Sequence, residues 1–318
     1  MGVIGKIYET RVWRVLCALS FLLFVVEAEA RNIQFSLYSM SDGLASDKVY
    51  QIDQDTCGHI WTTSDGGITR FDGSVMKIFD MENYPSLKRN DLYHVKCYDN
   101  GETFLGGSQG VLLKYDNLRD CFVDYSPEDF KSTYFKTIEG FSETRKGEPV
   151  VFTSGGLYML KAGDDRFTND FPAFKSFKDI YVRSFYEDVH GRYWVSSFNR
   201  LYVSDKEGNM LKEFDLFKDL SSMYSSKVIP ISDSLLLLSC FSDVMCKIKI
   251  EKDGSIKEPE FIHLPFSNLG NILLDEKGVF WYITDGFGLW CSDIPPQEGA
   301  HFEKIYPTNE SVGYMEKI

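Results

Sequence analysis

Histidine, cysteine and acidic side chains most often carry catalysis or bind metals, and their spacing in this sequence favours neither role. The five histidines form no H-x-x-x-H pair and the cysteines form no C-x-x-C motif, so we predict no metal site. Asp-rich turns offer oxygen ligands that suit Ca²⁺, but such turn acids are more commonly solvated. We expect no cofactor, and we identify no catalytic residue.

Paired carboxylates are a second way to perform chemistry, because two of them can hydrolyse a glycosidic bond placed between them. The sequence has 47 acidic residues, so spacing alone does not select a pair. The stretch DQDTCGHIW (53–61) resembles the Asp box of sialidases, with one extra residue between Asp and Gly. The arginine triad and nucleophilic tyrosine which that resemblance implies are not recognisable. We therefore expect no enzyme and keep a glycan lyase or hydrolase as the weakest alternative.

The elements that would position these residues begin after an export signal. Lys6, Arg11 and Arg14 precede the apolar stretch VLCALSFLLFVV (15–26), which ends in a small-x-small pattern at 28–30. This is typical of a secretory signal peptide over residues 1–30, so we expect a periplasmic protein that starts near Arg31.

Six cysteines follow the predicted signal peptide, at positions 57, 97, 121, 240, 246 and 291. Their irregular spacing favours buried small hydrophobic side chains. Disulfides are chemically possible after export, and Cys240 and Cys246 are placed so that they can face each other across a hairpin.

A unit of 43 to 46 residues then repeats six times along the chain. Each copy has a tight turn, a bulky strand residue three positions later and a second turn. The first turns centre on positions 58, 101, 147, 191, 234 and 278. The repeated positions are Asp55, Gly58, Trp61, Gly67, Gly101, Phe104, Gly110, Gly147, Gly191, Trp194, Gly278 and Trp281, with Ser234 in place of a turn glycine.

Such a period, made of short strands and turns, predicts a β-propeller with one four-stranded blade per unit. An apolar run such as KVYQIDQD (48–55) would form the inner strand of each blade. The Asp and Gly of each turn would hold it through local hydrogen bonds and positive φ. Since every blade must pack on its neighbours, we interpret Trp61, Phe104, Trp194 and Trp281 as inter-blade core. A sugar-stacking role for them is the alternative.

The first unit, SMSDGLASDKVYQIDQDTCGHIWTTSDGGITRFDG (39–73), resembles the two-component-regulator propeller repeat. The match includes the Gly-Leu pair, the Asp-x-x-Gly turn, the Trp and the final Gly-Ile-x-Arg-Phe-Asp. LDEKGVFWYITDGFGLW (274–290) is a second good copy, and units two to five are degenerate. These repeats form the periplasmic sensor region of hybrid two-component system sensors.

The resemblance implies an oligosaccharide ligand and control of glycan-utilisation genes. It also implies partners: a second propeller, a membrane span in the inner membrane, a histidine kinase and a possible homodimer. A secreted protein-interaction scaffold is the alternative from another class. The basic clusters needed to neutralise phosphates are missing from this acidic sequence of net charge −13, so we expect no contact with nucleic acid.

The ends of the repeat region predict an incomplete seventh blade. ESVGYMEKI (310–318) aligns with the inner strand of a further unit, and IQFSLYSM (33–40) is expected to supply that blade's outer strand. We therefore expect a propeller domain over residues 31–318 that is truncated at its C-terminus, with an open edge between blades six and seven.

Ligand-binding candidates lie just before inner strands, where loops surround the central funnel of a propeller. They are chosen because cations are few in this chain and anionic sugars require them. The alternative is that they are ordinary surface residues. The candidates are Lys88, Arg89 and Asn90 in one unit and Tyr181 and Arg183 in another.

Overall fold

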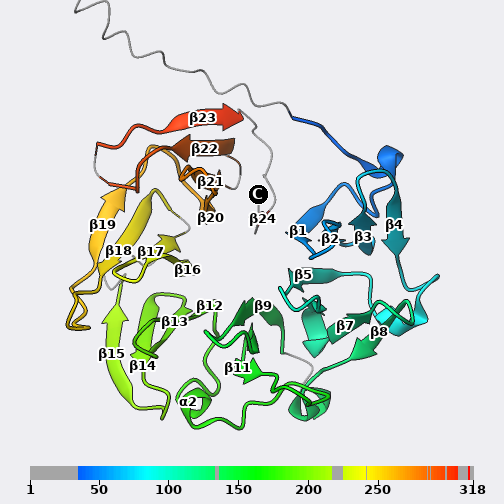
Figure 1. Cartoon of the computed structure of the whole chain (residues 1–318), viewed down its shortest axis with the longest axis horizontal. Coiled ribbons are helices and arrows are strands. Elements are labelled where there is room, and N and C mark those ends of the chain that lie inside the picture. The colour runs from blue at the N-terminus through cyan, green and yellow to red at the C-terminus, as the bar shows by residue number, and fades with distance from the viewer. Residues whose placement is uncertain are drawn as a thin grey trace, which may run out of the picture. The chain divides into compact units, whose positions relative to one another are not determined.

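Six antiparallel sheets follow one another in chain order around an open centre (Figure 1). The structure, a computed structural model, describes residues 35–132, 136–216, 225–240, 242–284, 286, 288–297, 299–306 and 314–315. All six sheets lie in the unit Tyr38–Ile318, which is distinct from the unit Met1–Leu37. The predicted signal peptide lies outside the described residues. Within the described ranges, no helix has the length and apolarity needed to cross a membrane.

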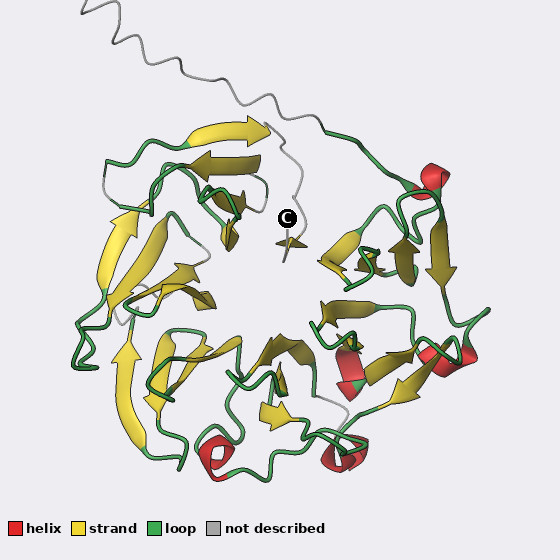
Figure 2. Ribbon diagram, in the orientation of Figure 1, coloured by secondary structure: helices red, strands yellow, loops and turns green. Residues whose placement is uncertain are grey.

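Each sheet is one blade, with its first strand nearest the centre and its last at the rim (Figure 2). The first blade contains β1 (Val49–Gln54), β2 (Ile60–Ser64), β3 (Ile68–Phe71) and β4 (Met76–Phe79). The second contains β5 (Leu92–Cys97), β6 (Thr103–Gly107), β7 (Leu112–Asp116) and β8 (Cys121–Asp124). The third contains β9 (Ile138–Glu143), β10 (Pro149–Thr153) and β11 (Gly156–Met159).

The remaining three blades are four-stranded. The fourth contains β12 (Ser184–Glu187), β13 (Tyr193–Ser197), β14 (Arg200–Ser204) and β15 (Met210–Asp215). The fifth contains β16 (Ser225–Ser232), β17 (Leu235–Cys240), β18 (Val244–Lys249) and β19 (Glu260–His263). The sixth contains β20 (Leu269–Leu274), β21 (Phe280–Thr284), β22 (Gly288–Ser292) and β23 (Glu303–Tyr306). The β-propeller and the six blades predicted from the repeat are therefore confirmed, with three strands in place of four in the third blade.

Short helices occupy connections between strands, and all but η3, which joins β6 to β7, lie at the rim of the ring (Figure 2). They are η1 (Met40–Asp42), η2 (Pro85–Leu87), η3 (Ser108–Gly110), η4 (Glu128–Ser132) and α2 (Pro172–Lys175). In the third blade, a two-way backbone bridge between Met159 and Thr168 takes the place of an outer strand. Phe174 of α2 is buried against that blade and the next.

Five apolar cores join successive blades. Each combines residues of one blade with the inner strands of the next: blades one and two, two and three, three and four, four and five, and five and six. Trp61, Phe104 and Trp194 are at most 1% exposed and belong to three of these cores, so the prediction that they are inter-blade core is confirmed. Trp281 is also buried, at 9% exposure, but lies outside the five cores.

The seventh blade predicted from the chain ends does not form a sheet of its own in the described residues. Beyond Tyr306 they contribute only the two-residue strand β24 (Tyr314–Met315). This strand pairs in parallel with β1 through Gln51 and Ile52, and it also contacts β20 (Figure 1).

The predicted outer strand at residues 33–40 is wrong where the structure describes it, since 35–39 lie in no strand. The reason is local. The Asp42 carboxylate accepts a 2.8 Å hydrogen bond from the Ser39 backbone N–H, and this capping places Met40, the last residue of the predicted strand, in helix η1. The Tyr38 ring packs 5.4 Å from the Phe71 ring of the first blade, not against the last blade.

Candidate functional site

The inner strands of all six blades line a central cavity of about 150 Å³. Every blade contributes side chains from nearly the same level of its inner strand. The lining includes Tyr50, Gln51, His94, Glu139, Gly140, Phe152, Arg183, Lys227, Gly270 and Asn271. These lining residues lie near the start of the inner strands. The ligand-binding candidates chosen from the sequence were expected to surround this same end of the channel.

Gly140 fits the cavity wall because it lacks a side chain. It lies opposite Phe152 in the β9–β10 pair, and its φ is +150°. A Cβ atom built there would lie 2.5 Å from Cζ of Phe152. The glycine therefore lets the Phe152 ring cover the inner strand and border the cavity.

Two of the predicted ligand-binding residues come together beside this cavity. The Tyr181 hydroxyl and the Arg183 guanidinium both interact with the Glu139 carboxyl group and act to lower its pKa. Burial has the larger effect and leaves the pKa of Glu139 raised overall. The Tyr181 ring also packs against Phe198, with 4.7 Å between ring centroids. Phe198 is 46% exposed, so an aromatic face stands next to a charged pair at the entrance of the channel.

The other three predicted residues do not join this group, because neighbouring groups engage them. Lys88 forms an ion pair with Asp124 of the same blade. Arg89 holds the Asp91 carboxylate with two 2.7 Å hydrogen bonds and lowers the pKa of Asp91. The Asn90 side-chain oxygen accepts a 2.7 Å hydrogen bond from the Met81 backbone N–H. The charges of Lys88 and Arg89 are thus already compensated, and only Tyr181 and Arg183 remain well placed for a channel ligand.

Sequence reasoning missed Glu139 and Phe198. Both could have been found by aligning the units on their first turns. Glu139 stands eight residues before Gly147, as Arg183 stands eight before Gly191, and Phe198 lies in the second turn of the same unit as Tyr181.

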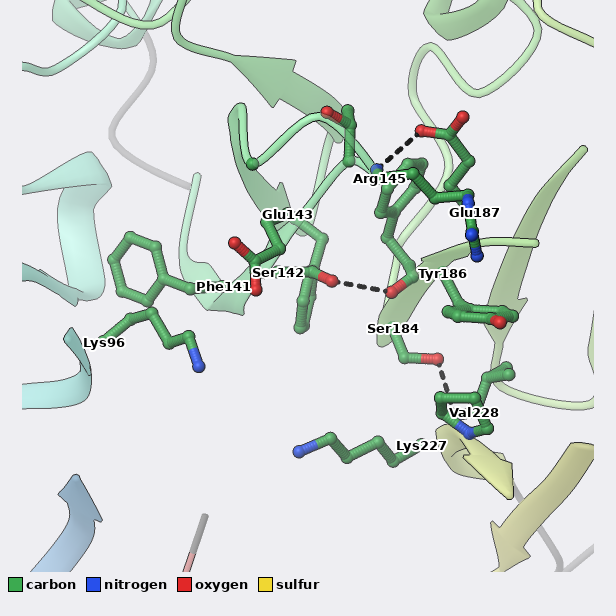
Figure 3. A pocket seen from close by; sticks show the side chains of 15 residues that line it. Lys96, Phe141, Ser142, Glu143, Arg145, Ser184, Tyr186, Glu187, Lys227 and Val228 are labelled. Atoms are coloured by element: carbon green, nitrogen blue, oxygen red, sulfur yellow. Dashed lines mark hydrogen bonds between the residues drawn. The ribbon is translucent and has the colours of Figure 1, made fainter. Parts of the chain in front are cut away.

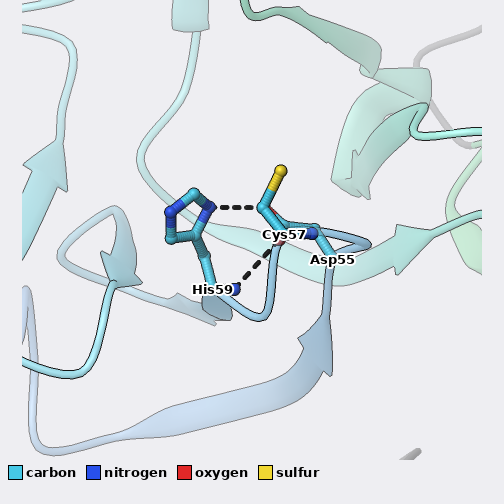
Figure 4. Close-up of side chains that lie close together, drawn as sticks. All are labelled: Asp55, Cys57 and His59. Carbon is cyan, nitrogen blue, oxygen red and sulfur yellow. Dashed lines mark hydrogen bonds and ion pairs between the residues drawn. The ribbon is translucent and has the colours of Figure 1, made fainter.

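Asp55, Cys57 and His59 form a cluster of ligand-type side chains in the first turn, with ligand atoms within 4.8 Å of one another (Figure 4). The Asp55 oxygens already accept four hydrogen bonds of 2.9 Å, from Cys57 N, His59 N, His59 Nδ1 and Trp61 Nε1. In the fourth blade, Arg192 makes the equivalent side-chain contact to Asp188. His59 thus occupies the position that Arg192 has in the fourth blade. The hydrogen bonds of the turn explain why the three side chains lie close together.

Comparison with known proteins gives stronger support for the fold of this chain than for its function. No protein-family model matches the sequence. A 60-residue segment is 35% identical to histidine kinase P4 of Formosa agariphila, covering 19% of this chain and 4% of that protein.

Among solved structures, the extracellular domain of the hybrid two-component system BT3049 from B. thetaiotaomicron matches with a TM-score of 0.62 and 16% identity. The match covers 78% of this chain and 33% of that one. The extracellular domain of BT4673 from the same organism gives 0.50 and 14%, covering 81% and 43%. Virginiamycin B lyase from Staphylococcus aureus gives 0.61 and 12%, covering 85% and 89%.

These likenesses place extracellular domains of hybrid two-component systems among the structural neighbours of this chain, as the repeat resemblance implied. At such identities they establish the propeller fold alone. The chain spans about a third of the BT3049 domain and a small fraction of histidine kinase P4.

Proposed function

We propose that this chain is the ligand-sensing, periplasmic part of a hybrid two-component receptor and that its ligand is an oligosaccharide. The carrying observation is the channel entrance, where the Tyr181 and Phe198 rings lie beside Glu139 and Arg183. Sugars present apolar ring faces to aromatic side chains and hydroxyl groups to charged hydrogen-bonding partners. The structural similarity to extracellular domains of hybrid two-component systems and the partial match to a histidine kinase support the proposal that the chain is part of a receptor.

In this proposal the chain performs no catalysis and acts through the rest of the receptor. A second propeller, a membrane span and a kinase would follow it, and the output would be transcription of glycan-utilisation genes. The ligand would favour one geometry of a receptor dimer over another, since only differential affinity for two states transmits a signal.

The same proposal assigns β24 as the inner strand of an additional blade. Its parallel pairing with β1 and its contact with β20 support this assignment, because it lies between the first and sixth blades. Trp281 supports it as well. Its counterparts Trp61 and Trp194 pack toward the following blade, and Trp281 is buried outside the five cores.

A binding experiment on the full chain tests the sensor proposal. Purified protein is titrated with a panel of neutral oligosaccharides from plant, algal and host glycans, and binding is followed by calorimetry. We expect at least one oligosaccharide to bind, and Phe198→Ala and Tyr181→Phe to weaken that binding. Phe261→Ala is the matched control, because Phe261 is 48% exposed on β19, the outermost strand of the fifth blade, and not at the channel.

Two results would contradict the proposal. One is the absence of binding to every member of the panel. The other is release of shortened products from any polysaccharide, which would favour the lyase or hydrolase alternative.

A further inference from the structure

A second and larger cavity, of about 580 Å³, extends from the level of the central cavity toward the first turns, and Figure 3 shows the side chains that line it. Its walls come from blades two to five, near the first turns. It shares Phe152 and Lys227 with the smaller central cavity, so the two adjoin along the channel. Its size falls in the range of small-molecule sites, roughly 300–1,000 Å³.

Three inner strands, β1, β9 and β12, bond the next blade through side chains at these levels of the channel. Gln51 donates to Val95 O at 3.1 Å, and the Asp53 carboxylate accepts from Cys97 N at 2.7 Å. Ser142 donates to Phe185 O at 3.0 Å, and the Ser184 hydroxyl accepts from Val228 N at 2.9 Å. Gln51 and Ser184 lie seven residues before their turn glycine, and Asp53 and Ser142 lie five before theirs.

Lysines stand at two of these repeated positions. Lys96 lies five residues before Gly101, and Lys227 lies seven before Ser234. An ammonium group has no acceptor capacity, so neither side chain can accept a backbone N–H as Asp53 and Ser184 do. Both extend from opposite sides into the same open space (Figure 3). A local departure from a repeated pattern is where a functional site is expected.

The charge balance of this cavity is positive. Lys96, Arg145 and Lys227 line it together with Glu143 and Glu187. Glu187 is already neutralised, because its carboxylate accepts from Lys206 Nζ at 2.6 Å and from the Arg145 backbone N–H at 3.0 Å. Cationic side chains therefore outnumber carboxylates in this lining, in a chain whose net charge is −13.

We propose that this cavity is a binding site for a small anionic sugar or sugar acid, with its acidic group held between Lys96 and Lys227. Glu143 then accepts hydrogen bonds from the hydroxyl groups, and the carboxylate or sulfate receives charge-assisted hydrogen bonds. The site adjoins the smaller cavity through Phe152 and Lys227 and extends from there toward the first turns, and it does not depend on the sensor assignment.

Calorimetric titration of the full chain with sodium D-glucuronate tests this site, with D-glucose 6-sulfate and neutral D-glucose as parallel probes. We expect the two anions to bind at least tenfold more tightly than glucose and the affinity to fall with added salt. Lys96→Gln and Lys227→Gln should each weaken anion binding by roughly tenfold or more. Lys146→Gln is the matched control, since Lys146 is an exposed lysine in the same turn region that does not line the cavity.

Thermal unfolding of each variant checks that the fold is retained, and Lys96→Arg keeps the charge if Lys96→Gln unfolds. Equal affinity for glucuronate and glucose, no binding of either anion, or equal losses in Lys96→Gln and Lys146→Gln would overturn the proposal. Preference for one anion over the other identifies carboxylate or sulfate as the recognised group. Phe198→Ala should leave glucuronate binding unchanged, so a failure of the sensor proposal is distinguishable from a failure of this one.

Discussion

The indole Nε1 of Trp61 donates a 2.9 Å hydrogen bond to Asp55 Oδ2, six residues earlier in the chain. The same 2.9 Å bond joins Trp194 to Asp188 and Trp281 to Asp275. In the other three blades both partners are replaced together, by the pairs Tyr98 and Phe104, Thr144 and Val150, and Ile231 and Leu237. Turn acid and strand tryptophan are therefore one unit, which in the first and fourth blades ties the turn to an inter-blade core.

This relationship predicts the cost of removing the acid. Asp55→Ala leaves the Trp61 N–H and two backbone N–H groups without their acceptor, so we expect the free energy of unfolding to fall by about 2–4 kcal/mol. Trp61→Phe keeps the aromatic packing and loses only one donor, and it should cost less. Urea unfolding measures both. Asp72→Ala, which removes an exposed turn acid, is the control, and an equal loss there would refute the link between turn and core.

Acid sensitivity follows from the same turns. Burial raises the pKa of Asp55, but hydrogen bonds from Trp61 and His59 outweigh it and leave the pKa below 3.8. For Asp275, burial is likewise outweighed by hydrogen bonds from Trp281 and from backbone N–H groups, and the net pKa is lowered. A lowered carboxyl pKa contributes stability above the unfolded value, and this stability is lost as the pH falls through the folded value.

We therefore expect stability to decline as the pH falls from about 4, the region of an unperturbed Asp pKa, toward lower values. Urea midpoints measured across this range test the expectation. Asp55→Ala should show a shallower decline than the wild type, and an unchanged slope would rule out a contribution from Asp55.

Thiol reactivity should separate Cys57 from the other cysteines. Cys57 is exposed, Cys121 is half-buried, and Cys97, Cys240, Cys246 and Cys291 are buried. Burial raises the pKa of Cys97 and of Cys240 to about 12 each, so both remain protonated at neutral pH, and only the thiolate is reactive.

Labelling the reduced native protein with a thiol reagent should therefore modify Cys57 first, Cys121 more slowly and the rest only on unfolding. The possible disulfide between Cys240 and Cys246 is not formed in the structure, where both are free thiols and Cys246 pairs across the hairpin with Leu238. Mass spectrometry after labelling in denaturant counts the thiols, and rapid native labelling of Cys240 would contradict this prediction.

Gly140 tests the packing at the centre of the ring. Gly140→Ala places a Cβ 2.5 Å from Cζ of Phe152, so we expect a loss of about 1–3 kcal/mol in the free energy of unfolding. Adding Phe152→Leu should restore part of this loss, because it removes the clashing ring atoms. A double variant no more stable than Gly140→Ala would show that backbone strain at φ +150° dominates. Gly147→Ala, where a Cβ meets no atom within 4 Å, controls for positive φ alone.

The repeat made the architecture predictable, because a constant spacing of turns and bulky residues reports a property shared by all blades. The inner strands, the turn chemistry of Asp55 and Gly58, and the inter-blade position of Trp61 followed from it. What distinguishes one blade from another was harder to predict. Residues 35–39, expected to form an outer strand, are irregular, and the helix η1 that Asp42 caps begins at Met40, which apolar alternation does not reveal.

The candidate site was only partly predictable for a related reason. Position before an inner strand selected Tyr181 and Arg183, but it equally selected Lys88 and Arg89, whose acidic partners Asp124 and Asp91 neutralise them in the folded chain. Lys96 and Lys227 went unnoticed because their importance depends on what Asp53, Ser142 and Ser184 do at matching positions in other blades. That comparison requires the register, which the structure supplies.

The two-residue strand β24 makes one junction of the ring different from the other five. Five junctions between blades are apolar cores, whereas at the junction of the sixth blade with the first the described residues show β24 paired with β1 and in contact with β20. Because the described residues form no apolar core at this junction, we expect small tilts of the blades to add up and to appear as opening there. A ligand that draws blades two and five together across the channel would therefore register its largest displacement on the far side, at β24.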